Sequence, residues 1–436
     1  MAIVRFITRL TSKRSSAALL DQFFVSGTSL LTTILVGRYC GADGLGLFSL
    51  AISVVVMVRG FQETLVSSPY TVFRSRVADR MTLEEHAAGA LAGAALLGSI
   101  VVCVLVMAAT ICSITPSLQS ISPLAWTLAL AAPLALAREF ARRFEMASLN
   151  MSSAMRIDAG ICFLQTGLIL ALALQGQLNS VTAVLIVGVA SGLMTAIWVF
   201  QRRKAFSFRR DTVISTIRHD WGFGRWLIAD QMLRFAQVYS MPWLLAGMLG
   251  TSATGVFAAC VSIAGLASPL LQGTGNYLAP RFAESIYDGS RHETMQLYWR
   301  ATASLGITIS LLAIVAAVFA EQLLWLLYDD PAYRGYGAVV GILAFRTACA
   351  IPAIAAHHAV VAMERPRRSA AATMIGLVVT VLTALPLIPL YGVWGAAIAS
   401  LLGTGCECFA LVTFFAHSLR GWAWADLCDV SPEGTR

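Results

Sequence analysis

The sequence predicts an all-α integral membrane protein with about twelve transmembrane helices in two lobes of six. Three observations support this fold class: the composition is apolar, long apolar segments alternate with short basic ones, and the first half of the chain is repeated in the second. Hydrophobic residues make up 58% of the 436 residues and charged residues only 12%, against roughly 25% charged residues in a soluble domain. The mean hydropathy is +0.74. These values indicate a membrane protein.

The repeat is visible in short matching segments. Asp21-Gln22 recurs as Asp230-Gln231, at an offset of 209 residues. Gly46-Leu47-Phe48 recurs as Gly255-Val256-Phe257 at the same offset of 209 residues. Two similar halves of an apolar chain are typical of transporters built from parallel repeats. Chance similarity is the alternative explanation, because Gly, Leu and Ala are common in any apolar segment.

Twelve segments are long and apolar enough to cross a bilayer, which takes about 20 mostly apolar residues. The predicted spans are 17–37, 44–66, 86–111, 122–146, 157–175, 180–200, 223–247, 252–273, 300–327, 336–361, 369–388 and 393–417. We therefore expect an amino-terminal lobe at 1–205, a basic linker at 206–222, a carboxy-terminal lobe at 223–420 and a tail at 421–436.

Basic residues fall on alternate connections between these spans. The even-numbered connections contain several, such as Arg202, Arg203 and Lys204 after the sixth span, whereas the odd-numbered ones are short and contain few. Because basic residues favour the cytoplasmic side, we expect both termini in the cytoplasm. Two lobes of six spans then have the same orientation and are related by a pseudo-twofold axis along the membrane normal, with a cavity between them.

Ionisable side chains inside apolar spans are costly unless they face a bundle interior or water, so each is a candidate functional residue. The arginines predicted to line a cationic cavity are Arg59, Arg138, Arg142, Arg234 and Arg346. Arg346 follows Arg138 by 208 residues and so matches it by repeat position, whereas Arg142 could merely mark the cytoplasmic end of its span. Arginine binds phosphate oxygens in a bidentate manner, so a cationic chamber suits a diphosphate.

Three carboxylates are candidates for coupling transport to an ion gradient: Asp21, Glu63 and Asp230. A carboxylate that alternately binds H⁺ or Na⁺ and pairs with an arginine can link cation entry to the opening of one lobe against the other. The alternative is structural, because Arg59 with Glu63, and Asp230 with Arg234, are four residues apart and can form neutral pairs within one helix.

Two further carboxylates are weaker candidates. Glu407 lies in the last span, and Asp158 lies at the start of the fifth span, where it could instead cap the amino end of its helix. The sequence contains no P-loop, GxSxG or HExxH motif, so we do not expect an enzyme. It has no CxxC or Cys/His pairing, so we expect no metal and no cofactor apart from a coupling ion. The arginines sit between spans as topology signals, so we do not expect nucleic acid as a partner.

Three segments resemble a known family. They read VGRYCGADGLGLFSLA at 36–51, AREFARRFEMASLNMSSAMRIDAG at 137–160 and LIPLYGVWGAAIASLLGTG at 387–405. They are similar to the polysaccharide-biosynthesis flippases of the multidrug/oligosaccharidyl-lipid/polysaccharide exporter (MOP) superfamily. The resemblance implies two lobes in a V shape and alternating access. It also implies that an undecaprenyl-diphosphate-linked oligosaccharide is flipped from the cytoplasmic to the periplasmic leaflet of a bacterial inner membrane.

The implied cellular role is the export of a lipopolysaccharide O-antigen or an exopolysaccharide. The implied partners are the lipid-linked oligosaccharide, membrane lipids and polysaccharide polymerase or assembly proteins. One alternative is a cation-coupled drug or metabolite antiporter of the same superfamily, for which we would expect a more acidic cavity. Another is a membrane-embedded polysaccharide polymerase or acyltransferase. Polymerases of sugar repeats commonly have a large periplasmic loop, and the sequence predicts none.

Overall fold

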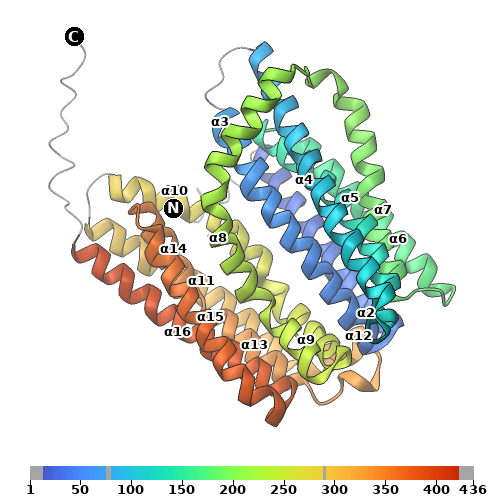
Figure 1. Cartoon of the computed structure of the whole chain (residues 1–436). Coiled ribbons are helices and arrows are strands. Elements are labelled where there is room, and N and C mark those ends of the chain that lie inside the picture. Colours follow the sequence, from blue (N-terminus) through green and yellow to red (C-terminus); the bar gives the residue numbers. More distant parts are fainter. Residues whose placement is uncertain (1–12, 75–79, 288–290, 422–436) are drawn as a thin grey trace. The chain divides into compact units, whose positions relative to one another are not determined.

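The computed structural model describes residues 13–74, 80–287 and 291–421, which are helical almost throughout. The chain divides into two compact units, Met1–Phe235 and Ala236–Arg436. The boundary between them falls inside the long helix α8 (Arg210–Leu249). Figure 1 shows the helices of each unit.

Unit 1 is organised around one central helix, α5. Its elements before α8 are α2 (Lys13–Gln62), η1 (Glu63–Ser67), α3 (Ser68–Arg74), α4 (Arg80–Ile114), η2 (Pro116–Ile121), α5 (Ser122–Ala147), α6 (Met151–Leu174), α7 (Ser180–Arg202) and η3 (Arg203–Ala205). Helix α5 contacts α2, α4, α6 and α7. A side chain on α5 can therefore reach partners on four other helices.

Unit 2 contains the rest of α8 and the remaining elements. They are α9 (Thr251–Ala264), η4 (Gly265–Ala267), α10 (Ser268–Tyr287), α11 (Arg291–Val318), α12 (Ala320–Tyr328), η5 (Pro331–Tyr333), α13 (Gly337–Cys349), α14 (Ile351–Ala362), α15 (Pro366–Tyr391) and α16 (Val393–Arg420). Helices α15 and α16 pack along each other, and α16 also contacts α13 and α14. Part of the core is formed by the buried rings of Phe282, Tyr298 and Phe415.

The helices confirm the predicted fold class. Among the described residues, nine helices are long and apolar enough to cross a membrane. One of them, Leu20–Arg74, covers nearly all of the first two predicted spans, 17–37 and 44–66, which lie on either side of the non-helical residue Gly41. The predicted span 223–247 lies in α8, and the span 252–273 covers α9, η4 and the start of α10. The protein is therefore an all-α, multi-pass membrane protein with about twelve transmembrane helices in two lobes.

A glycine turns the chain between the first two spans of each half. Gly41 has φ 68° and ψ −175° within α2, and Gly250 has φ 90° and ψ −177° at the start of α9. The two glycines are 209 residues apart, which is the offset of the repeated sequence. Glycine adopts a positive φ without a Cβ clash. The backbone therefore repeats at the same offset as the sequence.

Two further pairs of residues with positive φ occur at corresponding places in the two halves. Leu149 (φ 55°) follows α5 and Glu364 (φ 57°) follows α14. After each, the next amide donates to the carbonyl five positions earlier, at 2.9 and 3.1 Å, which is the bond of a Schellman helix end. Gly176 (φ 68°) and Gly392 (φ 60°) end α6 and α15. These pairs favour a true repeat over chance similarity.

Two predicted spans are interrupted. The span 300–327 is divided between α11, which ends at Val318, and α12. The span 336–361 is divided at Ala350 between α13 and α14, where Pro352 occupies the first turn of α14. Proline has no amide hydrogen and clashes with the preceding turn, so a helix cannot continue regularly through it. The hydropathy of these segments contains no signal for either break.

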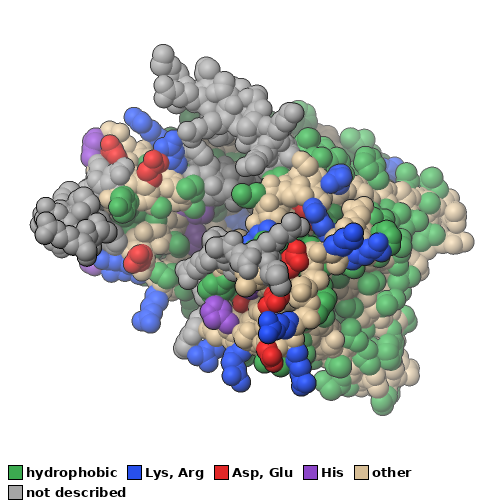
Figure 2. All heavy atoms as spheres, turned by 90° about the horizontal axis from the view of Figure 1, so that it is seen from above, with side chains coloured by type: hydrophobic (Ala, Val, Ile, Leu, Met, Phe, Trp, Pro, Cys, Tyr) green, Lys and Arg blue, Asp and Glu red, His purple; other side chains and the backbone are tan. Residues whose placement is uncertain are grey.

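The orientation argued from the basic connections is a prediction that labelling tests. Lys and Arg side chains gather on the face viewed in Figure 2, and hydrophobic side chains cover much of the flank. In a variant without native cysteines, Leu118→Cys and Gln177→Cys are expected to react with an impermeant maleimide added to spheroplasts. Arg203→Cys and Arg367→Cys are expected to react only after lysis. The opposite labelling pattern would show that the protein has the opposite orientation in the membrane.

Candidate functional site: a buried charge network in unit 1

Helix α5 brings together the ionisable residues of unit 1. Arg138 and Arg142 form one row along the helix and Glu139 and Arg143 form the next, because residues four apart share a helix face. Glu139 and Arg142 are buried, and Arg138 and Arg143 are half-buried. The charges therefore point into the helix bundle rather than out to lipid.

The first row joins α5 to α2 and α6. Arg142 Nη2 lies 2.7 Å from Asp21 Oδ2 of α2, and Arg142 Nε lies 2.6 Å from Asp158 Oδ2 of α6. Arg138 binds the other oxygen of Asp158. Both oxygens of Asp158 are therefore paired, whereas Oδ1 of Asp21 is buried and has no hydrogen-bond partner. The negative charge of Asp21 is therefore less fully compensated than that of Asp158.

The second row joins α5 to the region where α2 passes into η1. Glu139 accepts hydrogen bonds from Arg59 and from Arg143, whose Nε lies 3.0 Å from Glu139 Oε1. Arg143 also pairs with Glu63, the first residue of the π-helix η1. Single π-helical turns within α-helices are frequently found at functional sites.

The two rows together form a neutral network of four arginines and four carboxylates. Its members are Arg59, Arg138, Arg142, Arg143, Asp21, Glu63, Glu139 and Asp158. The predicted cationic cavity assumed arginines without compensating acids. In unit 1 each of these arginines has a carboxylate partner, so the network does not attract an anion by net charge.

Two structural alternatives considered from the sequence are wrong in detail. Arg59 and Glu63 do not neutralise each other, since each pairs with a residue of α5 instead. Asp158 does not cap a helix, because α6 begins at Met151 and Asp158 lies two turns inside it. Its side chain is fully buried between two arginines. The candidate rated weaker from the sequence is thus a central member of the network.

The predicted pair on α8 is described only in part. Arg234 is exposed on this helix. The side chain of Asp230 lies outside the described part of the structure. Its coupling role therefore stays a prediction.

A second cluster, which sequence reasoning did not identify, joins α5 to α7. Glu145 is fully buried and accepts two hydrogen bonds from Arg202, at 2.7 and 2.8 Å. Trp198 Nε1 and Asn150 Nδ2 each donate to the same carboxylate at 2.8 Å. The sequence pattern indicates only a topology signal at Arg202. With all its acceptor positions engaged, Glu145 is a structural clamp between the two helices.

In unit 2, Arg346 lies in the last turn of α13. Its Nε is buried and has no hydrogen-bond partner among the described residues. The carboxylate that interacts electrostatically with it is Glu407 of α16. Glu407 accepts hydrogen bonds from Thr373 Oγ1, at 3.1 Å, and from Gln237 Nε2. Arg346 has no ion pair within the described residues, so it is less fully compensated than the four arginines of the network in unit 1. Thr373 and Gln237 are polar partners of Glu407 that the sequence did not suggest.

Comparison with known proteins relates this arrangement to a transporter fold. No protein-family profile and no curated protein matches the sequence. A multidrug resistance MATE family transporter of the MOP superfamily, in an inward-facing conformation, is similar in structure with a TM-score of 0.73 and 15% identity, over 94% of this chain and 96% of that one. The chain has the fold of the MATE transporters.

Two further solved structures share this MATE fold. A variant of the MATE transporter VcmN of Vibrio cholerae has a TM-score of 0.64 and 15% identity, over 94% of this chain and 97% of that one. A MOP superfamily transporter from Pyrococcus furiosus has a TM-score of 0.66 and 13% identity, over 93% and 94% of the two chains. That protein is described as having a binding pocket of reverse polarity that suggests a different function. All three are transporters rather than enzymes, and the MATE fold belongs to the superfamily that the sequence resembles.

Proposed function

We propose that this protein is a proton-coupled antiporter of the MATE type, which moves a drug or metabolite across the membrane by alternating access between its two units. The arrangement that supports this proposal is Asp21–Arg142–Asp158. One guanidinium holds two carboxylates from two helices, and one oxygen of Asp21 is left without a partner. The neutral network of unit 1 also suits a substrate that is not an anion.

Asp21 is the residue on which a coupling proton would bind. Asp158 retains Arg138 whatever happens to Arg142, whereas Asp21 depends on Arg142 alone. A proton on Asp21 would remove the charge-assisted hydrogen bond between α2 and α5, and such bonds are roughly twice as strong as neutral ones. Arg142 would then remain with Asp158. Proton binding would loosen α2 from the central helix, and proton release would restore the contact.

The Asp21→Asn variant tests this proposal. In proteoliposomes, the wild-type protein is expected to accumulate the fluorescent organic cation ethidium in response to an imposed pH gradient. The Asp21→Asn variant keeps the shape of the side chain but cannot ionise. It is expected to bind ethidium, measured by fluorescence in detergent, and to lose the dependence of transport on the gradient.

Asp43→Asn is the matched control, because Asp43 is an exposed carboxylate of the same helix and lies outside the network. This control should respond to the gradient as the wild type does. If Asp21→Asn also accumulates ethidium in response to the gradient, Asp21 is a structural counter-ion and the proposed coupling is wrong.

A lipid-linked oligosaccharide flippase is the second candidate function. It is supported by the resemblance of residues 137–160 and 387–405 to that family, and by Arg346, whose Nε has no partner in the described part of unit 2. An arginine that keeps an unpaired donor suits a diphosphate, which accepts hydrogen bonds from guanidinium groups. This function would go with a bacterial inner membrane, cytoplasmic termini, and polymerase or assembly proteins as partners.

The same proteoliposomes separate the two functions. A fluorescent polyprenyl-diphosphate disaccharide is placed in both leaflets, and dithionite added outside quenches only the molecules in the outer leaflet. About half of the fluorescence therefore survives unless a flippase exchanges the lipid between leaflets. Under the antiporter proposal ethidium moves and the labelled lipid stays protected. Loss of this protection, with no movement of ethidium, would identify the flippase instead.

A further inference from the structure

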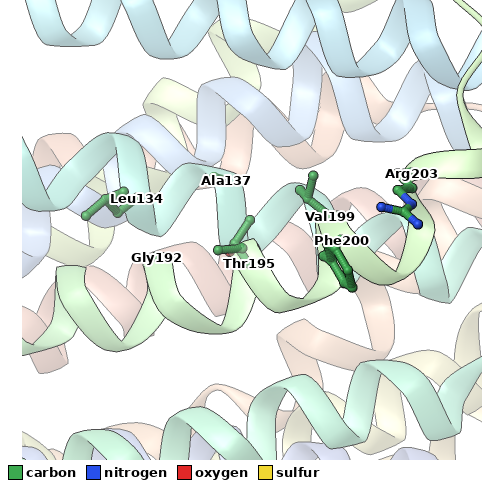
Figure 3. Close-up of a pocket in the computed structure, with 8 residues that line it drawn as sticks. Leu134, Ala137, Gly192, Thr195, Val199, Phe200 and Arg203 are labelled. Atoms are coloured by element: carbon green, nitrogen blue, oxygen red, sulfur yellow. The ribbon is translucent and has the colours of Figure 1, made fainter.

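A groove of about 560 Å³ runs along the outside of unit 1 between α5 and α7. Leu134 and Ala137 of α5 form one wall, and residues of one face of α7 form the other (Figure 3). The α7 residues include Gly192, Thr195 and Val199, which are spaced three or four apart. The groove is apolar along most of its length.

Gly192 keeps the groove open. A Cβ at this position would lie 3.1 Å from Leu134 Cδ2, so any side chain here would project into the space between the helices. The groove is also open to the surroundings of the protein, since Phe200 at its edge is 68% exposed. Because α7 is a membrane-spanning helix, these surroundings are the acyl chains of the bilayer.

The groove ends at a cation. Arg203 lies at the opposite end from Leu134, and its guanidinium carbon is 4.7 Å from the centre of the Phe200 ring (Figure 3). The preceding Arg202 is engaged with Glu145, whereas no ion pair of Arg203 is present in the described part of the chain. Lys204 follows directly and adds to the local positive charge.

The dimensions fit a lipid in one leaflet. The twelve residues from Gly192 to Arg203 are separated by eleven steps, which rise by about 16 Å in a helix. Half of the hydrocarbon core of a bilayer is about 15 Å thick. An acyl chain lying in the groove would therefore reach toward the middle of the bilayer while its headgroup lay beside Arg203.

We propose that this groove is a binding site for an anionic phospholipid of the bilayer, with one acyl chain between α5 and α7 and the phosphate on Arg203. The site favours a lipid with net negative charge because Arg203 and the adjacent Lys204 are both positively charged. Each basic residue near a membrane surface adds to the attraction of anionic lipids. An arginine without an ion pair suits a phosphodiester. The groove lies on the lipid-facing flank, so the proposal does not depend on what the protein transports.

Native mass spectrometry of the full-length protein in detergent tests the site. Phosphatidylglycerol and phosphatidylcholine with identical acyl chains are titrated against the wild type, and phosphatidylglycerol is expected to bind more tightly. Arg203→Gln is expected to weaken phosphatidylglycerol binding about fivefold, since the charge of one basic residue is lost. Its effect on phosphatidylcholine should be smaller.

Two more variants separate the groove from general surface charge. Gly192→Leu fills the apolar part of the groove, so it should weaken the binding of both lipids to a similar extent. Thermal unfolding checks that this variant is folded. Arg209→Gln removes an exposed arginine of the same connection that does not line the groove, and it should leave both affinities unchanged.

Two results would overturn the proposal. An effect of Arg209→Gln as large as that of Arg203→Gln would show that net charge alone attracts the lipid. Displacement of phosphatidylglycerol by a lower concentration of a polyprenyl diphosphate would assign the groove to a transported lipid rather than to a phospholipid of the bilayer.

Discussion

Replacement of Arg142 by methionine is expected to lower the free energy of unfolding by about 3 to 5 kcal/mol, the usual cost of removing one partner from a buried ion pair. Arg142 binds Asp21 at 2.7 Å and Asp158 at 2.6 Å. Methionine keeps much of the volume of the side chain, so packing changes little. The loss arises because Asp21 would be left as a buried carboxylate with no cation. Thermal unfolding of the purified protein in detergent measures the change.

Arg143→Met is the matched control on the same helix. The side chain of Arg143 is 36% exposed and that of its partner Glu63 is 33% exposed. Its other partner, Glu139, keeps Arg59. Removing a solvated ion pair is expected to cost less than about 1 kcal/mol. Equal effects of the two substitutions would show that burial does not set the strength of this network.

A double variant tests the cause of the loss. Adding Asp21→Asn to Arg142→Met removes the unpaired charge, while Asp158 keeps Arg138. The double variant is expected to recover most of the stability, because neutralising a buried group removes the cost of leaving its charge uncompensated. If the double variant is as unstable as Arg142→Met, the loss comes from packing and not from charge.

The sequence predicted the helices and the repeat because both are set by constraints that act locally. A bilayer requires each span to satisfy its backbone hydrogen bonds internally and to be about 20 residues long. The turn at Gly41 and its counterpart at Gly250 need a glycine at a defined place, so sequence and backbone repeat with the same offset. The break at Ala350 has such a signal in Pro352, whereas no proline or glycine stands at the break after Val318.

The pairing of the charges could not be predicted because the partners come from distant helices. Arg142 is 121 residues from Asp21, and Arg59 is 80 residues from Glu139. The sequence suggested instead the local pair Arg59 and Glu63, which requires a regular α-helix. Glu63 is the first residue of the π-helix η1, and its side chain does not pair with Arg59. It points to Arg143 instead.

The long sequence separation of the partners also explains why the sequence predicts a cationic cavity around these arginines. Their positions within spans are visible in the sequence, but the carboxylates that compensate them are not. The sequence predicts Asp158 at the start of a helix because the apolar run begins at 157. In the structure α6 begins at Met151, so Asp158 moves into the bundle, where Arg138 and Arg142 reach it. Because α6 begins six residues earlier than predicted, Asp158 is a member of the charge network and not a helix cap.

Replacement of Gly403 by alanine is expected to destabilise the protein by about 1 to 3 kcal/mol or more, the range found for overpacked interiors. Gly403 of α16 faces α15 at close range. A Cβ there would lie 1.7 Å from Thr380 Oγ1 and 2.7 Å from the carbonyl oxygen of Gly376. Thr380 is buried, and its branched side chain has few rotamers in a helix. The carbonyl of Gly376 belongs to the backbone of α15, so the two helices would have to separate.

Gly405→Ala, two residues further along α16, is the control for the substitution itself. A Cβ at Gly405 would meet no atom within 4 Å. Alanine is favoured over glycine within a helix by roughly 0.5 to 1 kcal/mol, so this variant should unfold at the same temperature as the wild type or slightly higher. Similar melting temperatures for Gly403→Ala and Gly405→Ala would show that α15 and α16 are not packed as closely as the structure has them.

The double variant with Gly403→Ala and Thr380→Ala separates the clash with the Thr380 hydroxyl from the clash with the Gly376 carbonyl oxygen. It removes the hydroxyl that lies 1.7 Å from the added carbon and leaves the Gly376 carbonyl oxygen at 2.7 Å. Stability should therefore return only in part. Glu407 lies one turn beyond Gly403, and its Cβ is 2.8 Å from where a Cβ of Gly376 would be. A shift of α16 away from α15 would carry Glu407 away from Thr373, so Gly403→Ala is expected to disturb the surroundings of Arg346 as well as the helix packing.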